Sequence, residues 1–150
     1  MLIISHRGNL DGPSTPVENK IEQIELCISK KIPVEIDVWY TKKGLFLGHD
    51  YPEDSIHLDF LYDRSHSLWI HCKNAESYDY LTDFKSLNVF FHQTDDYTLT
   101  SKGDIWTFPK RPVVSKSVIV CQSEEETLSN LKKNIRGICT DFVHLALQNS

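Results

Sequence analysis

The sequence predicts an α/β fold with a mainly parallel sheet, and three observations support this. Short apolar runs rich in β-branched residues recur along the 150-residue chain. Several of these runs are continuous rather than alternating, which is typical of strands buried on both faces. Segments with apolar residues at helical spacing lie between some of the runs, and such alternation of strands and helices favours parallel pairing.

Eight strands are expected from the apolar runs. We predict them at residues 2–5, 34–38, 45–48, 68–72, 89–92, 104–107, 118–121 and 137–140. The connection 39–44 is too short for a parallel crossover, which needs a dozen or more residues. Residues 34–48 are therefore predicted to form an antiparallel β-hairpin around Lys42, Lys43 and Gly44. The stretch 94–103 is short and rich in Asp and Thr, which predicts a loop or a single turn.

Four helices are expected between or after the strands. The first is predicted from an apolar stripe at helical spacing, made of Val17, Ile21, Ile24 and Ile28. Its N-cap, N1 and N3 positions are predicted to be Thr15, Pro16 and Glu18. A second helix is predicted over 75–84 with Asn74 as its cap, and a third after Ser123, which would form a capping box with Glu126. Residues 142–148 are predicted to form the last helix.

Composition and charge limit the class of protein. The chain carries 16 Lys and Arg against 21 Asp and Glu, a formal charge of −5, and has no long basic run. A nucleic-acid partner is therefore disfavoured, since neutralising phosphates needs a basic face. No apolar stretch is long enough to span a membrane, so no integral membrane contact is expected. The length suits one domain, 1–150, with its own core.

The cysteines and the N-terminus indicate a cytoplasmic protein. The N-terminal residues lack the basic region and the long apolar region of a signal peptide. None of the four cysteines belongs to a CxxC pair, and each lies in or beside an apolar segment. We therefore expect buried free thiols rather than disulfides or a zinc site.

Polar residues gather at the carboxyl ends of the predicted strands, where functional groups of α/β proteins collect. The first strand ends in Ser-His-Arg-Gly at 5–8, the third in Gly-His-Asp at 48–50, and the fourth in His-Cys-Lys at 71–73. The second strand carries Glu35 and Asp37, and the last ends in Asp141. A purely structural domain does not account for this clustering of titratable groups.

The Glu35–Asp37 pair points to a divalent cation. Alternation along a strand places both carboxylates on one face, where their repulsion needs compensation. Oxygen ligands favour Mg²⁺, Ca²⁺ or Mn²⁺. The alternative is a solvated strand face whose acidic side chains pair with lysines.

Two histidines, an arginine and a lysine suit acid–base and phosphate chemistry. His6 and His49, at neighbouring strand ends, can share general acid and base roles near neutral pH. Arg7 can bind a phosphate with two N–H groups, and Lys73 can act as a point charge. Each has a structural alternative, such as a solvated helix start for Lys73. Asp141 is equally well explained as the N-cap of the last helix.

Together these fragments resemble the glycerophosphodiester phosphodiesterases, within the phospholipase C-like phosphodiesterase superfamily. The order and spacing of the motifs between His6 and Asp50 carry the resemblance. The matching pieces are His6-Arg7-Gly8, Glu18-Asn19, Glu35-Ile36-Asp37-Val38, Thr41-Lys42-Lys43-Gly44, His49-Asp50, Lys73 and Thr140-Asp141-Phe142.

The resemblance implies a compact, distorted TIM-type (β/α) barrel that hydrolyses a small phosphodiester with the help of a divalent metal ion. Because 150 residues are too few for eight crossover helices, several of these helices would be missing. The roles implied by the family are as follows: catalytic, His6 and His49; phosphate-binding, Arg7 and Lys73; metal-binding, Glu35 and Asp37; supporting, Glu18, Asn19 and Asp141.

Two departures from the family pattern bear on metal and substrate. The third metal carboxylate is replaced by His71, a ligand that suits Mn²⁺ or Zn²⁺ better than Mg²⁺ or Ca²⁺. Only residues 51–67 follow the His49-Asp50 motif before the next strand, which implies an open substrate mouth. Small barrels with few helices expose apolar sheet surface, so the sequence is compatible with a homodimer.

Two other functions remain compatible with these residues. The His71 replacement would suit a module that binds phosphodiesters or sugar phosphates without cleaving them. A related barrel enzyme, either a phospholipase-like lyase that releases a cyclic phosphate or a phosphomonoesterase, would use similar groups.

Overall fold

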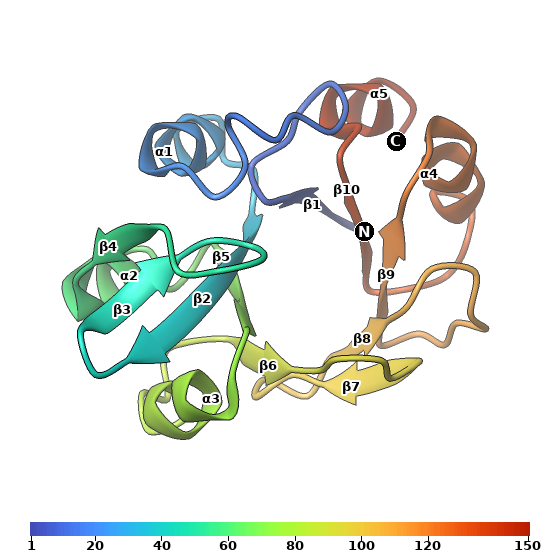
Figure 1. Ribbon diagram of the computed structural model, residues 1–150. Coiled ribbons are helices and arrows are strands. Elements are labelled where there is room, and N and C mark those ends of the chain that lie inside the picture. The colour runs from blue at the N-terminus through green and yellow to red at the C-terminus, as the bar shows by residue number, and fades with distance from the viewer.

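The strands form one curled sheet, seen end-on in Figure 1 with the helices on its outside. The computed structural model describes all residues, Met1–Ser150. The strands are β1 Leu2–His6, β2 Val34–Thr41, β3 Gly44–Leu47, β4 Asp54–Ile56, β5 Leu68–Cys72, β6 Val89–Phe91, β7 Tyr97–Leu99, β8 Ile105–Thr107, β9 Ser117–Cys121 and β10 Gly137–Thr140. The helices are α1 Ile21–Ser29, α2 Leu58–Asp63, α3 Ala75–Leu81, α4 Glu124–Asn130 and α5 Val143–Gln148.

The sheet is mostly parallel, as the sequence predicts. Its order is β4-β3-β2-β1-β10-β9-β8-β7, and β5 pairs with β2 and β6. The antiparallel pairs are β2–β3, β3–β4 and β7–β8. No ladder joins β6 to β7 or β8, so strand pairing does not close the sheet into a complete barrel. Single hydrogen bonds link the two edges, such as that from the Ser101 N–H to the Val89 carbonyl at 2.8 Å. What the structure shows is an α/β fold with a curled sheet and few helices.

Alternation along the strands separates an outer core from an inner one. On β2, Val34, Ile36 and Val38 belong to the large cluster that also contains Ile24 of α1 and Leu81 of α3. A smaller cluster fills the inside of the curl beneath the strand ends, and it consists of Ile4, Trp69, Phe90, Trp106, Val118 and Cys139. Because side chains alternate along a strand, the residue two positions after each member of this inner cluster also projects inward, near the carboxyl end of its strand.

The predicted strands and the hairpin are confirmed, with shifts of one to three residues at some ends. β2 and β3 form the antiparallel hairpin, in which Thr41 pairs with Gly44 around the lysine turn. Three short elements were not predicted: β4 and α2 lie within residues 51–67, and β7 lies within the stretch 94–103 that was expected to be a loop or a turn. Strands of three residues are too short for alternation to identify them.

The predicted start of the first helix is wrong. Residues 15–19 form turns, and α1 begins at Ile21 after Lys20, whose side chain makes no capping bond. The reason is Asn19, whose φ of +57° is incompatible with a continuing helix. Thr15 and Pro16 therefore do not occupy the N-cap and N1 positions of a helix.

The other helix starts follow the prediction more closely. Asn74 caps α3 through a capping box with Ser77, and the helix ends at Leu81 rather than at 84. The hydroxyl of Ser123 accepts from the backbone of Glu126, but the Glu126 carboxylate accepts from Gln122 instead of completing the box. No helix combines the length and the apolar character needed to cross a membrane.

Candidate active site

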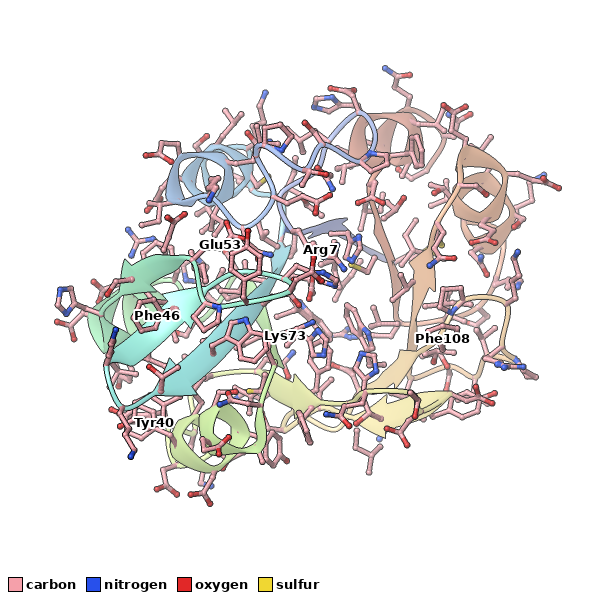
Figure 2. The ribbon with its side chains drawn as sticks, in the orientation of Figure 1. Arg7, Tyr40, Phe46, Glu53, Lys73 and Phe108 are labelled. Carbon is pink, nitrogen blue, oxygen red and sulfur yellow. The ribbon has the colours of Figure 1, made fainter.

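Inward-facing side chains at the carboxyl ends of the strands line a cavity of about 480 Å³. The predicted residues that line it are His6, Arg7, Glu35, His49, His71 and Lys73. Figure 2 shows Arg7 and Lys73 on one side of this central region and Phe108 across from them. Four other predicted residues support the lining side chains from behind: Glu18, Asn19, Asp37 and Asp141.

Glu35, Asp37 and His71 form the one group of acidic, histidine and cysteine side chains arranged to hold a metal ion. Their ligand atoms all lie within 4.8 Å of one another. β2 supplies the two carboxylates and the neighbouring β5 supplies the imidazole, because Asp37 is in register with His71. The Nδ1–H of His71 donates to Asp37 Oδ1 at 2.9 Å and lies 3.8 Å from Glu35 Oε1.

The two carboxylates differ in how their charge is compensated. Asp37 is fully buried, and burial alone would raise its pKa. The hydrogen bond from His71 and the charges of Lys73 and Arg7 outweigh burial and hold the pKa of Asp37 well below its usual range. Lys73 Nζ lies 3.3 Å from Asp37 Oδ1, and Arg7 Nε lies 3.2 Å from Asp37 Oδ2. The Arg7 Nε contact is an ion pair without hydrogen-bond alignment.

Glu35 lacks comparable compensation. It is 2% exposed, and its carboxylate accepts one hydrogen bond, a long one of 3.3 Å from the backbone N–H of Arg7. Burial and the charge of Asp37 raise the pKa of Glu35. A divalent cation near Glu35 and His71 would supply the missing positive charge, so the residues present fit a metal ion.

A turn after β1 holds the arginine and the supporting glutamate. Arg7 has a left-handed φ of +55°, and its Nη1–H donates to Glu18 Oε2 at 3.3 Å. The Asn9 amide bridges Glu18 and Asp141, with hydrogen bonds of 2.9 and 2.8 Å. Asn19 donates to Asp37 Oδ2 and accepts from the Asp37 backbone N–H, each at 2.9 Å. These contacts explain Glu18 as a support of the site rather than as part of a helix cap.

His6 is joined to Asp141 from the last strand. Its Nδ1–H donates to Asp141 Oδ1 at 2.9 Å, which leaves Nε2 as the nitrogen available to a ligand. Burial lowers the pKa of His6, but the hydrogen bond to Asp141 and the charge of Glu35 outweigh burial, so the pKa is raised above 6.5. Asp141 is thus a partner of His6, and the last helix is capped by Phe142 without a side-chain bond.

His49 reaches the same cavity from the loop after β3. The Trp39 indole N–H donates to the carbonyl of Gly48 at 2.7 Å and fixes the start of this loop. The side chain of His49 is 39% exposed, and its Nδ1 pairs with the adjacent Asp50 at 2.8 Å. Burial lowers the pKa of His49, and the charges of Arg7 and Lys73 lower it further, although Asp37 acts in the opposite direction. The two histidines therefore have pKa values shifted in opposite directions.

Several residues of the site were not predicted from the sequence. Asn9 supports two carboxylates, and His92 stacks on His71 with ring centroids 4.5 Å apart. His92 could have been found from the alternation of Phe90 and His92 along the predicted strand. Gln93 and Gln122 line the cavity but carry no signal in the sequence. No residue from 51–67 lines the cavity.

Comparison with known proteins does not identify a family. No protein-family model matches the chain, and no curated protein matches it. The function is therefore inferred from the geometry of the cavity.

Proposed function

We propose that the protein is a metal-dependent phosphodiester hydrolase of the glycerophosphodiester phosphodiesterase type, built on a compact, distorted (β/α) barrel. One observation carries this proposal: two histidines with oppositely shifted pKa values line one cavity together with Arg7, Lys73 and a buried carboxylate. Pairs of titratable groups separated in this way are typical of acid–base catalysis.

The positive groups would hold the phosphodiester. A guanidinium has five N–H donors, and one of those of Arg7 is engaged by Glu18, so others can bind phosphate oxygens. Lys73 adds a point charge from the end of β5. Glu35, Asp37 and His71 would hold the metal ion, which when bound supplies Lewis-acid stabilisation of the charge on the phosphoryl oxygens.

The histidines divide the proton transfers. His49, with its lowered pKa, accepts the proton of the attacking hydroxyl, either a neighbouring substrate hydroxyl or a water molecule. The new P–O bond forms as the bond to the leaving alcohol breaks. His6, with its raised pKa, donates a proton from Nε2 to the leaving oxygen, and Asp141 stabilises the imidazolium. If the attacking group is a substrate hydroxyl, water opens the resulting cyclic phosphate with the two roles reversed.

The test is turnover of bis-(p-nitrophenyl) phosphate and of glycerophosphodiesters with Mg²⁺, Ca²⁺ or Mn²⁺. With glycerophosphodiesters, whose leaving alcohol needs a proton, His6→Ala and His49→Ala should each reduce kcat by about 10²- to 10⁴-fold, the usual value of a general acid or base. With bis-(p-nitrophenyl) phosphate only His49→Ala should do so, because p-nitrophenolate leaves without a proton. His66→Ala, an exposed histidine outside the cavity, is the matched control and should keep full activity. Full activity of either cavity variant toward glycerophosphodiesters contradicts the acid–base roles.

Metal dependence is tested separately from turnover. Calorimetric titration with Mn²⁺ should show one site in the native protein and none in Glu35→Gln, while exhaustive chelation should stop hydrolysis. Hydrolysis that survives chelation would remove the metal ion from the proposal.

One observation favours a second candidate, a phosphodiester-binding module. The charge of Asp37 is already compensated by Lys73 and Arg7, so the cationic groups could hold a phosphodiester without a metal ion. Binding without any turnover would support the module. A stable cyclic phosphate as product would instead indicate a lyase, and inorganic phosphate would indicate a monoesterase.

A further inference from the structure

The cavity has two chemically different sides. The side formed by β1, β2 and β5 carries the ionisable groups described above. Apart from these groups and His92, the lining consists of Gln93, which follows β6, and of Trp106, Phe108, Pro109, Val120 and Gln122 at the ends of β8 and β9. We call these six residues the neutral wall. In Figure 2, Phe108 marks this wall across from Arg7 and Lys73.

Strand alternation explains why the wall lies where it does. On β8, Trp106 belongs to the inner core, and Phe108 follows it by two positions toward the cavity. On β9, Val118 lies in the same core, and Val120 and then Gln122 continue the inward series. Those positions hold apolar or amide side chains, whereas the inward-facing side chains that β2 and the residue after β5 contribute to the lining are Glu35 and Lys73.

Two rings give the wall an apolar surface. Trp106 is 4% exposed and stacks on Phe90 at 4.4 Å, so it is a fixed part of the wall with one face covered. Phe108 lies at the rim and keeps 43% of its surface exposed, so it can take up a ligand without losing packing in the core.

Charged groups near the wall are paired with one another or do not line the cavity. His92 is not part of the wall, because its ring stacks on His71 with 4.5 Å between the ring centroids. Outside the lining, Lys110 lies 3.5 Å from Glu126, and Arg111 lies 2.8 Å from Asp96. Asp95, on the loop after β6, acts on His92 only through its charge and does not line the cavity.

We propose that the neutral wall binds the alcohol group of the phosphodiester and selects a neutral, ring-bearing alcohol over a cationic one. This inference rests on the proposed hydrolase function. With the phosphate held at Arg7 and Lys73, the second half of the substrate has to extend across the cavity. A ring would pack on Phe108, and the amides of Gln93 and Gln122 would donate to and accept from its hydroxyl groups.

A quaternary ammonium group has no comparable site. No carboxylate lies on the wall, and the two fixed cations of the cavity repel a third. Aromatic residues bind such cations through their ring faces, but one face of Trp106 is covered by Phe90. Phe108 alone does not make a cage.

The test compares kcat/KM for two diesters that differ in the alcohol, glycerophosphoinositol and glycerophosphocholine. The wild-type protein should prefer the inositol diester. Phe108→Ala should lower kcat/KM for that diester by about tenfold through KM, with a smaller effect on the choline diester. Because Phe108 is half exposed, circular dichroism should show an unchanged fold.

A second variant changes the charge of the wall while keeping the size and shape of the side chain nearly the same. Gln122→Glu places a carboxylate on the wall and should shift the preference toward the choline diester by at least about threefold. Gln148→Glu makes the same change on the exposed end of α5, outside the cavity, and should leave the preference unchanged.

The outcomes separate this inference from the proposed function. Hydrolysis of both diesters with equal preference, or with a preference for choline, would overturn the neutral wall and leave the hydrolase intact. So would a Gln122→Glu variant that behaves like Gln148→Glu. If the wild-type protein hydrolyses no diester with any of the three metal ions, the proposed function fails and this inference fails with it.

Discussion

Asn19 ties the turn before α1 to the carboxylate at the centre of the site, and its removal should be costly. Its Nδ2–H donates to Asp37 Oδ2 and its Oδ1 accepts from the Asp37 backbone N–H, both at 2.9 Å. Asn19 is 3% exposed and Asp37 is fully buried, so water cannot replace the lost amide. The perturbation to test is Asn19→Ala.

The magnitude follows from three effects. The buried N–H of Asp37 would lose its side-chain partner, and the ionised Asp37 carboxylate would lose a donor; each loss is worth about 1–3 kcal/mol. Alanine at a φ of +57° would add about 1 kcal/mol, since Asn tolerates the left-handed region better. Asn19→Ala should therefore lower the free energy of unfolding by about 3–7 kcal/mol, a large share of a typical total.

Urea unfolding followed by circular dichroism measures this loss. Asn19→Gly removes the same amide but accepts a positive φ, so it should be about 1 kcal/mol more stable than Asn19→Ala. A double-mutant cycle with Asp37→Asn should give a coupling energy of at least about 1 kcal/mol. Loss of less than about 1 kcal/mol in Asn19→Ala, or no coupling to Asp37, would refute the proposed bridge.

Three further predictions concern the loop of His49, the His6–Asp141 pair and the thiols. Gly48→Ala should reduce both stability and phosphodiester turnover, because the new Cβ would lie 2.1 Å from the carbonyl oxygen of Tyr51 and because Gly48 has a φ of +145°. If this variant turned over phosphodiesters as fast as the wild-type protein, the position of the His49 loop would not matter for activity. Asp141→Asn should destabilise the protein more at about pH 5.5 than at about pH 8.5 in urea unfolding. Despite burial, the pKa of His6 is raised above 6.5, so its share of the stability is complete below that pH and is lost as the pH rises through the folded-state pKa. The pKa of Asp141, which burial alone would raise, is lowered below 3.8 by the bond from His6, so its share is lost only in stronger acid; a larger effect at the higher pH would contradict this pairing. Burial raises the pKa of all four thiols, Cys27, Cys72, Cys121 and Cys139, and raises it to about 12 for Cys72 and Cys121. The native protein should therefore not react with dithionitrobenzoate, whereas the unfolded chain should react at all four positions. Fast labelling of the native protein would refute the burial of the thiols.

The sequence was most informative along the central strands. The pattern Val-Glu-Ile-Asp-Val over residues 34–38 predicts a strand with one apolar face and one acidic face, and the structure places them in the outer core and toward the site. Polar residues at strand ends were expected to converge, and the curled sheet brings the ten predicted site residues together. Their roles in hydrolysis stay predictions.

Other features depend on tertiary structure that no local pattern contains. The turn at Glu18 and Asn19 fits a helix start in sequence, but contacts with Arg7 and Asp37 override this local preference. The valine and the glutamines of the neutral wall escaped prediction because neither residue type has a distinctive chemistry. Only the register of β8 with β9 gives those side chains a common face.

The parallel pairing of β1 with β10 has a consequence for synthesis of the chain. His6 and Asp141 are 135 residues apart, so translation delays the pairing of β1 on this edge by on the order of ten seconds. During that time one edge of β1 lacks its neighbour and can pair with other chains. His6 also lacks its partner Asp141 until β10 and the residue that follows it have been synthesised. Assembly of the site and protection of this edge are therefore completed by the same late step of folding.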